Sequence, residues 1–420
     1  MFVQPGYDRL DREWAQYWAQ GSVLYSMLGV NTSNFLNFDY SPANPIVLPN
    51  LASGATPVAP YPGFRRANQT DLKEPRVVQY SISVDRNVGW QTLLRFNYTG
   101  SFTENLIYSP DLNQVKPNTV GYAALVATPQ LRQQNLRFPN FREVLTRDNG
   151  PVADYNALEV EVTRRFAPDL TFQNSYTLAY NRTNALGSAP NSFVPNGERG
   201  LDRSGDNGGN VLNYFDIRSD YGNAAFTHRH RFVSTFVYAL PFGRNRHFLG
   251  NLDGVADKVA GGWQLTGITL LQTGPFLTPT FTGTDPSGTA PSSRSVSGFM
   301  RPDCVNGVDP LAPSPSRARW LNSAAFALPG NNIGRFGNCG VGIMVGPGTR
   351  NFSTSIGKRF NVNERVSVLY EAQISNLFNR TNLGIPNTQV GSSSFGRITS
   401  TQAAEQAGSR NIQMSLRISF

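Results

Sequence analysis

The chain ends with NIQMSLRISF, residues 411–420, in which apolar and polar side chains alternate at every step. One set of alternate positions is apolar: Ile412, Met414, Leu416, Ile418 and Phe420. The positions between them are polar: Gln413, Ser415, Arg417 and Ser419. A helix would spread the apolar side chains around its circumference, whereas a strand places them all on one side. The segment therefore predicts a β-strand with one apolar and one polar face.

The same alternation recurs upstream, in segments of about 10 to 14 residues. The clearest examples are residues 76–86, 90–102, 155–165, 170–180, 351–360 and 366–375. Residues 230–242 and 261–274 are strand-like but alternate less cleanly. The pattern predicts about eight long strands and an all-β fold.

The composition agrees with an all-β protein that has long polar loops. The 420 residues include 39 Gly, 28 Pro and 39 Asn, which favour turns and disfavour helix interiors. No apolar run approaches the roughly 18 to 20 residues that a transmembrane helix needs. The 27 Phe, 16 Tyr and 5 Trp are too many for a chain that buries nothing, which argues against disorder. The 37 basic residues are scattered along the chain without a long run, so no nucleic-acid partner is expected.

The connections between the predicted strands alternate between short and long. Short links are expected at 87–89, 166–169 and 361–364, and a medium one at 243–262. Long loops are expected at about 103–153, 184–227, 281–348 and 380–409. Short turns at one rim and long loops at the other are typical of an outer-membrane β-barrel. Tilted strands of about 9 to 11 residues also suffice to cross a bilayer.

The chemistry of the two faces favours a barrel over a soluble β-sandwich, whose strands are usually shorter. The apolar face is expected to meet lipid and to carry Tyr80, Leu94, Phe96, Tyr98, Val160, Phe172, Tyr176 and Tyr370. The polar face is expected to line a water-filled lumen and to carry Arg95, Asn97, Glu159, Glu161, Glu371 and Gln373. We therefore predict an antiparallel transmembrane β-barrel in the outer membrane of a Gram-negative-type bacterium, with the lipid bilayer as a partner.

Six segments, taken in their order along the chain, carry a resemblance to a known family. They are LRFNYTGSFTENL (94–106), DYNALEVEVTRRF (154–166), LTFQNSYTLAYNRT (170–183), DYGNAAFTHRHRFVSTFVYALPFGR (220–244), GGWQLTGITLLQTGPFLTP (261–279) and SNLFNRTNLGIPN (375–387). With the last strand, they make the chain resemble the C-terminal part of Oar-like TonB-dependent receptors. The resemblance implies a barrel of about 22 strands, filled by an N-terminal plug and preceded by a β-sandwich domain. It also implies uptake powered by the inner-membrane TonB complex.

The chain departs from that family pattern at its N-terminal end. The first residues, MFVQPGYDRLDREW, are charged and do not read as a secretory signal peptide. No TonB box, sandwich domain or plug is recognised. Residues 1–75 are expected to be a loop-rich segment with room for part of a strand, and residues 76–420 a C-terminal barrel segment. Because an open sheet leaves unpaired edges in lipid, we expect a fragment of a longer reading frame. A degenerate paralogue and a small self-closing barrel are the alternatives.

The C-terminal strand also carries a second expectation. Barrels of the resembled type end in an aromatic residue preceded by alternate apolar residues, which the barrel-assembly machinery reads. Met414, Leu416, Ile418 and Phe420 match that signal. An exposed edge strand can pair with the edge of another protein. The alternative is that Phe420 only completes a lipid-facing strand.

Other residues that draw attention give no catalytic, cofactor or metal site. Cys304 and Cys339 fit no zinc pattern, and either a disulfide within one long loop or two unpaired thiols is open. His228 and His230 would point to the same side of a strand, but a structural role is preferred to a metal site. The segment from Asp202 to Asp206 resembles a calcium loop but lacks its glycine and its final glutamate.

The sequence thus predicts a non-enzymatic outer-membrane receptor that binds and takes up an extracellular solute, such as an oligosaccharide or a peptide. The TonB complex would act only on an intact parent that has a plug. Two alternatives stay open: an adhesion barrel without transport, and a secreted carbohydrate-binding β-sandwich. The loops contain no motif that identifies the ligand.

Overall fold

A computed structural model describes most of the chain from residue 61 onward. The described residues are 61–68, 71–108, 110–128, 131, 134–137, 141–164, 169–185, 212–225, 227–289, 300–361, 365–402 and 407–420. The first 60 residues and the calcium-like segment from Asp202 to Asp206 lie outside them.

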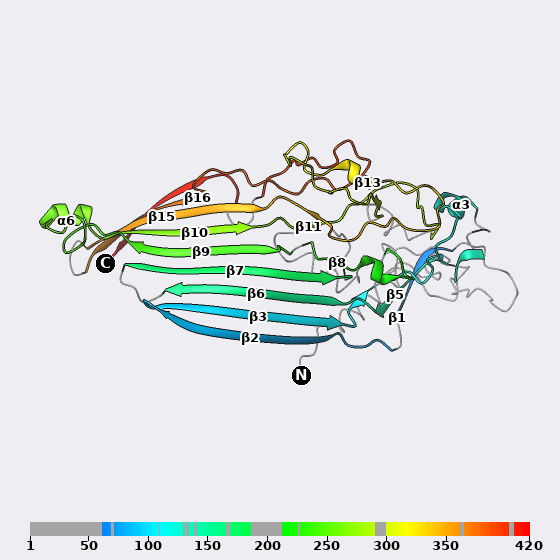
Figure 1. The fold of residues 1–420 in the computed structure, drawn as a ribbon, viewed down its shortest axis with the longest axis horizontal. Helices are drawn as coiled ribbons and strands as arrows, with labels where there is room; N and C mark the ends of the chain where they lie inside the picture. Colours follow the sequence, from blue (N-terminus) through cyan, green and yellow to red (C-terminus); the bar gives the residue numbers. More distant parts are fainter. Residues whose placement is uncertain are drawn as a thin grey trace, which may run out of the picture.

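Nine long strands form one sheet, in the order β17-β16-β15-β10-β9-β7-β6-β3-β2, and the short β8 pairs with β7 (Figure 1). Their bounds are β2 (Arg76–Gly89), β3 (Thr92–Glu104), β6 (Ala153–Arg164), β7 (Leu170–Thr183), β8 (Gly222–Asn223), β9 (His230–Ala239), β10 (Trp263–Gln272), β15 (Thr349–Asn361), β16 (Ser367–Ser375) and β17 (Asn411–Ser419). The nine long strands correspond one to one to the nine alternating segments of the sequence, so the predicted total of about eight is one too low. All pairings between them are antiparallel, and β2 and β17 are the sheet's two edges.

The register gives the sheet one apolar and one polar face. Phe96 lies opposite Val84 on one side and Val160 on the other, while its chain neighbour Arg95 lies opposite Asp85 and Glu161. Successive side chains of a strand point to opposite faces, so directly paired residues share one. The alternation read from the sequence is therefore continued from strand to strand.

Short and long connections lie at opposite ends of the sheet (Figure 1). At one end are the β2–β3 turn, the C-terminus and α6 (Gly254–Ala260), which lies between β9 and β10. The β2–β3 turn is centred on Trp90 and Gln91, both with positive φ, rather than on the expected 87–89. We call this end the turn rim and the other the loop rim.

Segments beyond the loop rim, 105–152, 184–229, 273–348 and 376–410, contain only short elements, and we call their described parts the loop cap. The elements are β4 (Ile107–Tyr108), α3 (Tyr122–Ala127), β5 (Phe141–Asn149), η3 (Ile217–Asp220), β11 (Phe276–Leu277), β12 (Asp303–Cys304), η4 (Ser323–Ala325), β13 (Phe326–Ala327) and β14 (Met344–Val345). Strand β1 (Tyr61–Asn68) pairs with β5 in a small separate sheet. None of the described helices is long and apolar enough to cross a membrane.

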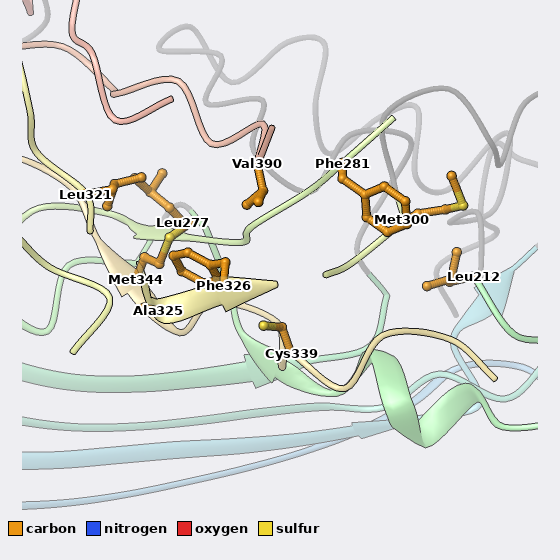
Figure 2. Close-up of a cluster of buried hydrophobic side chains, with 10 residues drawn as sticks. All are labelled: Leu212, Leu277, Phe281, Met300, Leu321, Ala325, Phe326, Cys339, Met344 and Val390. Atoms are coloured by element: carbon orange, nitrogen blue, oxygen red, sulfur yellow. The ribbon is translucent and has the colours of Figure 1, made fainter. Parts of the chain in front are cut away.

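The hydrophobic core of the described chain lies in the loop cap rather than against the sheet. Figure 2 shows the main cluster, which joins three of the four cap segments. Its members are Leu212, Leu277, Phe281, Met300, Leu321, Ala325, Phe326, Cys339, Met344 and Val390. By contrast, many apolar side chains on the sheet are exposed, including Ile82 at 65% and Met414 at 70%. The apolar face of the sheet is thus left without a protein partner among the described residues.

Candidate functional site

The polar face carries a charged network across β2, β3, β6 and β7. Arg95 binds Asp85 through two parallel hydrogen bonds, Nε to Oδ1 and a terminal nitrogen to Oδ2, each 2.8 Å long. Its other terminal nitrogen lies 3.9 Å from Glu161 Oε2. Glu161 Oε1 in turn accepts hydrogen bonds from Thr163 Oγ1 at 2.7 Å and Gln173 Nε2 at 2.9 Å. Four neighbouring strands are joined by one polar chain of contacts.

The remaining polar residues predicted from the sequence lie on the same face. Asn97 is opposite Ser83 and Glu159, and Ser83 Oγ donates to Asn97 Oδ1 at 2.8 Å. Towards the other edge of the sheet, Glu371 accepts a 3.1 Å hydrogen bond from Ser355 Oγ. Gln373 is paired with Ser355 and with Gln413 of β17. The structure therefore places the predicted polar set on one surface, in two groups near opposite edges of the sheet.

The predicted apolar residues share the opposite surface. Val160 faces Phe96 and Tyr176, while Leu94 faces Val162. Phe172 is paired with Phe236, and Tyr370 with Lys358 and Leu416. The hydroxyls of Tyr80 and Tyr98 both donate to Asn156 Oδ1 at 2.8 Å. These two tyrosines lie nearer the loop rim than Phe96, so their polar groups are gathered toward one end of the apolar face.

The C-terminal strand forms an exposed edge. All residues of β17 are exposed, and β17 pairs with β16 on one side only. Met414, Leu416 and Ile418 continue the apolar face through their pairings with Ala372, Tyr370 and Val368. Phe420 follows the last strand residue and is fully exposed.

A buried ion pair joins two segments of the loop cap. Arg301 donates to Asp220 Oδ1 at 2.5 Å, and their side chains are only 6% and 3% exposed. Arg301 also donates to the carbonyls of Cys339 and Ser219, and Asp220 Oδ2 accepts from the Leu212 backbone at 2.9 Å. A buried charge left without its partner costs about 3–5 kcal/mol, so this well-bonded pair fixes the two segments together. This pair could not be predicted from the sequence, because 81 residues separate its members.

Cys304 and Cys339 are joined by a disulfide in the loop cap. Next to it, Arg335 binds both carboxylate oxygens of Asp303, at 2.7 and 3.0 Å, and the Asn338 backbone donates to the same carboxylate. The Arg335 guanidinium holds the pKa of Asp303 below its ordinary value, while the carboxylate raises the pKa of Arg335. Residues 303–339 thus form a loop closed by one covalent and one ionic contact.

His228 and His230 each bind a different partner. His228 Nδ1 lies 2.6 Å from the carbonyl oxygen of Thr273, and His230 Nδ1 lies 2.7 Å from the hydroxyl of Tyr176. Across the described part of the chain, no cluster of three or more His, Cys, Asp or Glu side chains is placed to hold a metal ion. The geometry of the molecule offers a polar sheet surface and a packed loop cap.

A comparison with protein families bears on this architecture. The family described as outer membrane beta barrel domain matches residues 10–413. The chain belongs to this family. The predicted fold class, an antiparallel outer-membrane β-barrel, is confirmed, and so is its location in the cell outer membrane. The alternative of a secreted β-sandwich is wrong.

Solved structures give more distant likenesses to this outer-membrane barrel chain. The outer membrane transporter YddB from Escherichia coli is 8% identical, with a TM-score of 0.39 over 84% of this chain and 34% of that chain. The FrpB iron transporter from Neisseria meningitidis is also 8% identical, with a TM-score of 0.35 over 84% and 32%. The pyoverdine outer membrane receptor FpvA from Pseudomonas aeruginosa is 11% identical, with a TM-score of 0.34 over 83% and 30%. The chain spans about a third of the length of these proteins. No curated protein matches the sequence.

Proposed function

We propose that the chain forms part of the barrel wall of an Oar-like TonB-dependent receptor. In this proposal the receptor takes up an extracellular solute such as an oligosaccharide or a peptide. The support is the order of the segments that resemble this family. They coincide with β3, β6, β7, the β8–β9 region, the β10–β11 region and the turn after β16. We assign the barrel no catalytic step.

In this proposal the apolar face of the sheet meets lipid and the polar face lines the lumen. The observation that carries it is the Asp85–Arg95–Glu161 network, which lies on the face opposite Phe96. Charged groups in the hydrocarbon region are expensive and usually face a water-filled interior. The exposed apolar face has no protein partner among the described residues, and in this proposal lipid chains cover it.

The direction of the edge strands supports closure by further strands. Eight successive antiparallel pairings separate β2 from β17, so both edges run in the same direction. Joining them directly would create a parallel pair, whereas bacterial single-chain barrels have an even number of antiparallel strands. We therefore propose that residues 76–420 are one arc of a larger wall, and that residues 1–75 lead into it.

The loop cap is the part that we propose contacts the ligand. The turn rim, where the chain ends, would face the periplasm, and the cap would face outward. The barrel-assembly machinery would read Met414, Leu416, Ile418 and Phe420 on the exposed edge of β17. The TonB complex would act through a plug in the intact receptor.

The assignment of faces is tested by an arginine placed on each face of β3. Phe96→Arg should destabilise the membrane-inserted protein by about 2–4 kcal/mol, since an arginine would meet hydrocarbon. Asn97→Arg, one residue along, should cost far less because it would point into the lumen. Unfolding by denaturant in lipid vesicles measures both. Equal losses for the two variants would contradict the proposal.

Uptake and adhesion are separated in a strain that carries the intact parent gene. Labelled oligosaccharide and peptide mixtures are offered to wild-type cells, to cells without the gene and to cells without the TonB complex. For a receptor, some solute should enter wild-type cells only. For the adhesion alternative, surface binding would need the gene but not the TonB complex, and no solute would depend on both for entry.

A further inference from the structure

The turn after β16 is held in one position by Asn376. This side chain is 2% exposed, and its Nδ2 donates to the carbonyls of Arg380 at 2.9 Å and Gly408 at 2.7 Å. Its Oδ1 accepts from the Arg380 backbone at 2.9 Å, and the residue has a positive φ of 49°. The next backbone nitrogen, of Leu377, donates to the Phe352 carbonyl of β15. The turn is therefore fastened to the neighbouring strand at the loop rim.

This turn places an exposed aromatic ring beside the apolar face. Phe378 is 67% exposed, and its ring packs edge-on against Phe352, with 5.2 Å between the ring centroids. Phe352 shares the apolar face with Ile356, because the two are four residues apart in one strand. An aromatic side chain at this height is suited to the boundary between hydrocarbon and headgroups.

Three arginines flank the turn that carries Phe378. Arg350 precedes Phe352 by two residues on the same face of β15, and Arg380 ends the turn. Arg410 lies just before β17, where its guanidinium reaches the Leu377 carbonyl at 3.4 Å and its backbone donates to Asn379 Oδ1. All three are exposed, and none has a carboxylate partner among the described residues. Around this turn, the described residues thus place three arginines and no carboxylate bonded to them.

We propose that Arg350, Arg380, Arg410 and Phe378 form a site for the phosphorylated headgroup of a glycolipid in the outer leaflet, of the lipid A type. The site rests on the proposed lipid-facing assignment of the apolar face, with which it is continuous. Guanidinium groups bind phosphate through paired hydrogen bonds, and basic residues near an anionic leaflet add to membrane attraction. The ring of Phe378 meets the acyl chains below the phosphates.

At the turn rim, the cation on the same face of β15 is Lys358, and it is buried and bonded to protein carbonyls. Its ammonium donates to the carbonyls of Lys258 and Val259 at 2.6 and 3.0 Å, and the residue is 4% exposed. Its charge is used to hold α6. The arginines at the loop rim, by contrast, leave their guanidinium groups exposed to the leaflet.

The test compares two triple variants of the protein extracted from outer membranes in mild detergent. R350Q/R380Q/R410Q removes the proposed site, and R317Q/R319Q/R397Q removes three exposed arginines of the loop cap as a matched control. Mass spectrometry measures co-purified lipid A per protein. We expect a drop of at least about ten-fold for the first variant, because each charge contributes several-fold, and no change for the control. Equal lipid A in both variants would overturn the proposal.

A second measurement uses the wild-type protein alone and does not depend on variant assembly. Native mass spectrometry is performed with bisphosphorylated lipid A, with phosphate-free lipid A and with inorganic phosphate. Adducts should form with the bisphosphorylated lipid only. Equal binding of phosphate-free lipid A would show that the acyl chains suffice, and capture of inorganic phosphate alone would identify an ion site; either result refutes a headgroup site. Solute uptake is not measured, so a failed uptake experiment and a failed lipid experiment remain distinct.

Discussion

At the scale of single residues, Asp303 shows how one carboxylate organises a loop. It accepts two hydrogen bonds from Arg335 and one from the Asn338 backbone, next to the disulfide of Cys304 and Cys339. The hydrogen bonds from Arg335 are the largest cause of its lowered pKa. Folding therefore favours the charged form of Asp303. This contribution to stability is fully present above the ordinary pKa of 3.8 and is lost as pH falls through the lower folded value.

The direction of this pH dependence leads to a prediction for cleavage of the 303–339 loop by pepsin. Wild-type protein should keep residues 303–338 intact at about pH 4 and lose that protection only at lower pH. In Arg335→Gln the carboxylate loses its main partner, so cleavage should begin at higher pH. Mass spectrometry after reduction locates the cuts. Arg319→Gln, at an exposed arginine of the same segment that binds no carboxylate among the described residues, serves as control; an unchanged cleavage profile in Arg335→Gln would contradict the prediction.

At the scale of elements, the long strands are defined by which face each side chain occupies. A shift of one residue in pairing would move every apolar side chain to the polar face. The charged pairs Arg95–Asp85 and Arg95–Glu161 oppose such a shift in β3, since it would place Arg95 among the apolar side chains. Strand β17 has a partner on one side only, so its register depends on β16 alone.

The exposed end of β17 gives a prediction about assembly. If the assembly machinery reads Phe420, Phe420→Ala should lower the amount of folded protein in the outer membrane several-fold, because the edge would be recognised less well. Ser419→Ala changes the neighbouring residue on the polar face and should have no effect. Membrane fractionation and the heat-dependent shift in gel mobility measure the folded amount. Equal yields of both variants would leave Phe420 with only a lipid-facing role.

At the scale of the whole molecule, the structure has two parts that are stabilised differently. The sheet exposes many of its apolar side chains, whereas the loop cap has a hydrophobic core and a buried ion pair. The cap core joins residues as distant as Leu212 and Val390 (Figure 2). Because its segments share one core, we expect the cap to open as a unit while the sheet stays intact.

Leu321→Ala tests this division. Leu321 is 1% exposed in the cap core, so truncation should cost about 2–5 kcal/mol. Hydrogen exchange should increase together in residues 212–224, 276–281 and 388–398, and not in β3. Leu328→Ala, at a cap residue that is 54% exposed, is the matched control. Faster exchange confined to the neighbourhood of residue 321 would show that the cap segments open independently.

Several features could be predicted from the sequence because they depend on neighbouring residues. Alternation in β2, β3, β6, β7 and β17 is a local property of an extended chain, and it predicted both strand positions and shared faces. The β2–β3 turn was predicted a few residues early, because Asn87 and Gly89 are stronger turn residues than Trp90 and Gln91. All nine alternating segments form strands, although their predicted total was about eight.

By itself, the sequence determined that this protein is an antiparallel outer-membrane barrel with two chemically distinct faces. A period of two is a property of neighbouring residues, so it can be recognised without the structure. Only the tertiary structure decided which distant groups meet. Arg301 meets Asp220, Asn376 reaches Gly408, and Arg350 lies on the face that Phe378 borders. These contacts depend on how the long loops fold over one another, and loop spacing alone does not specify that packing.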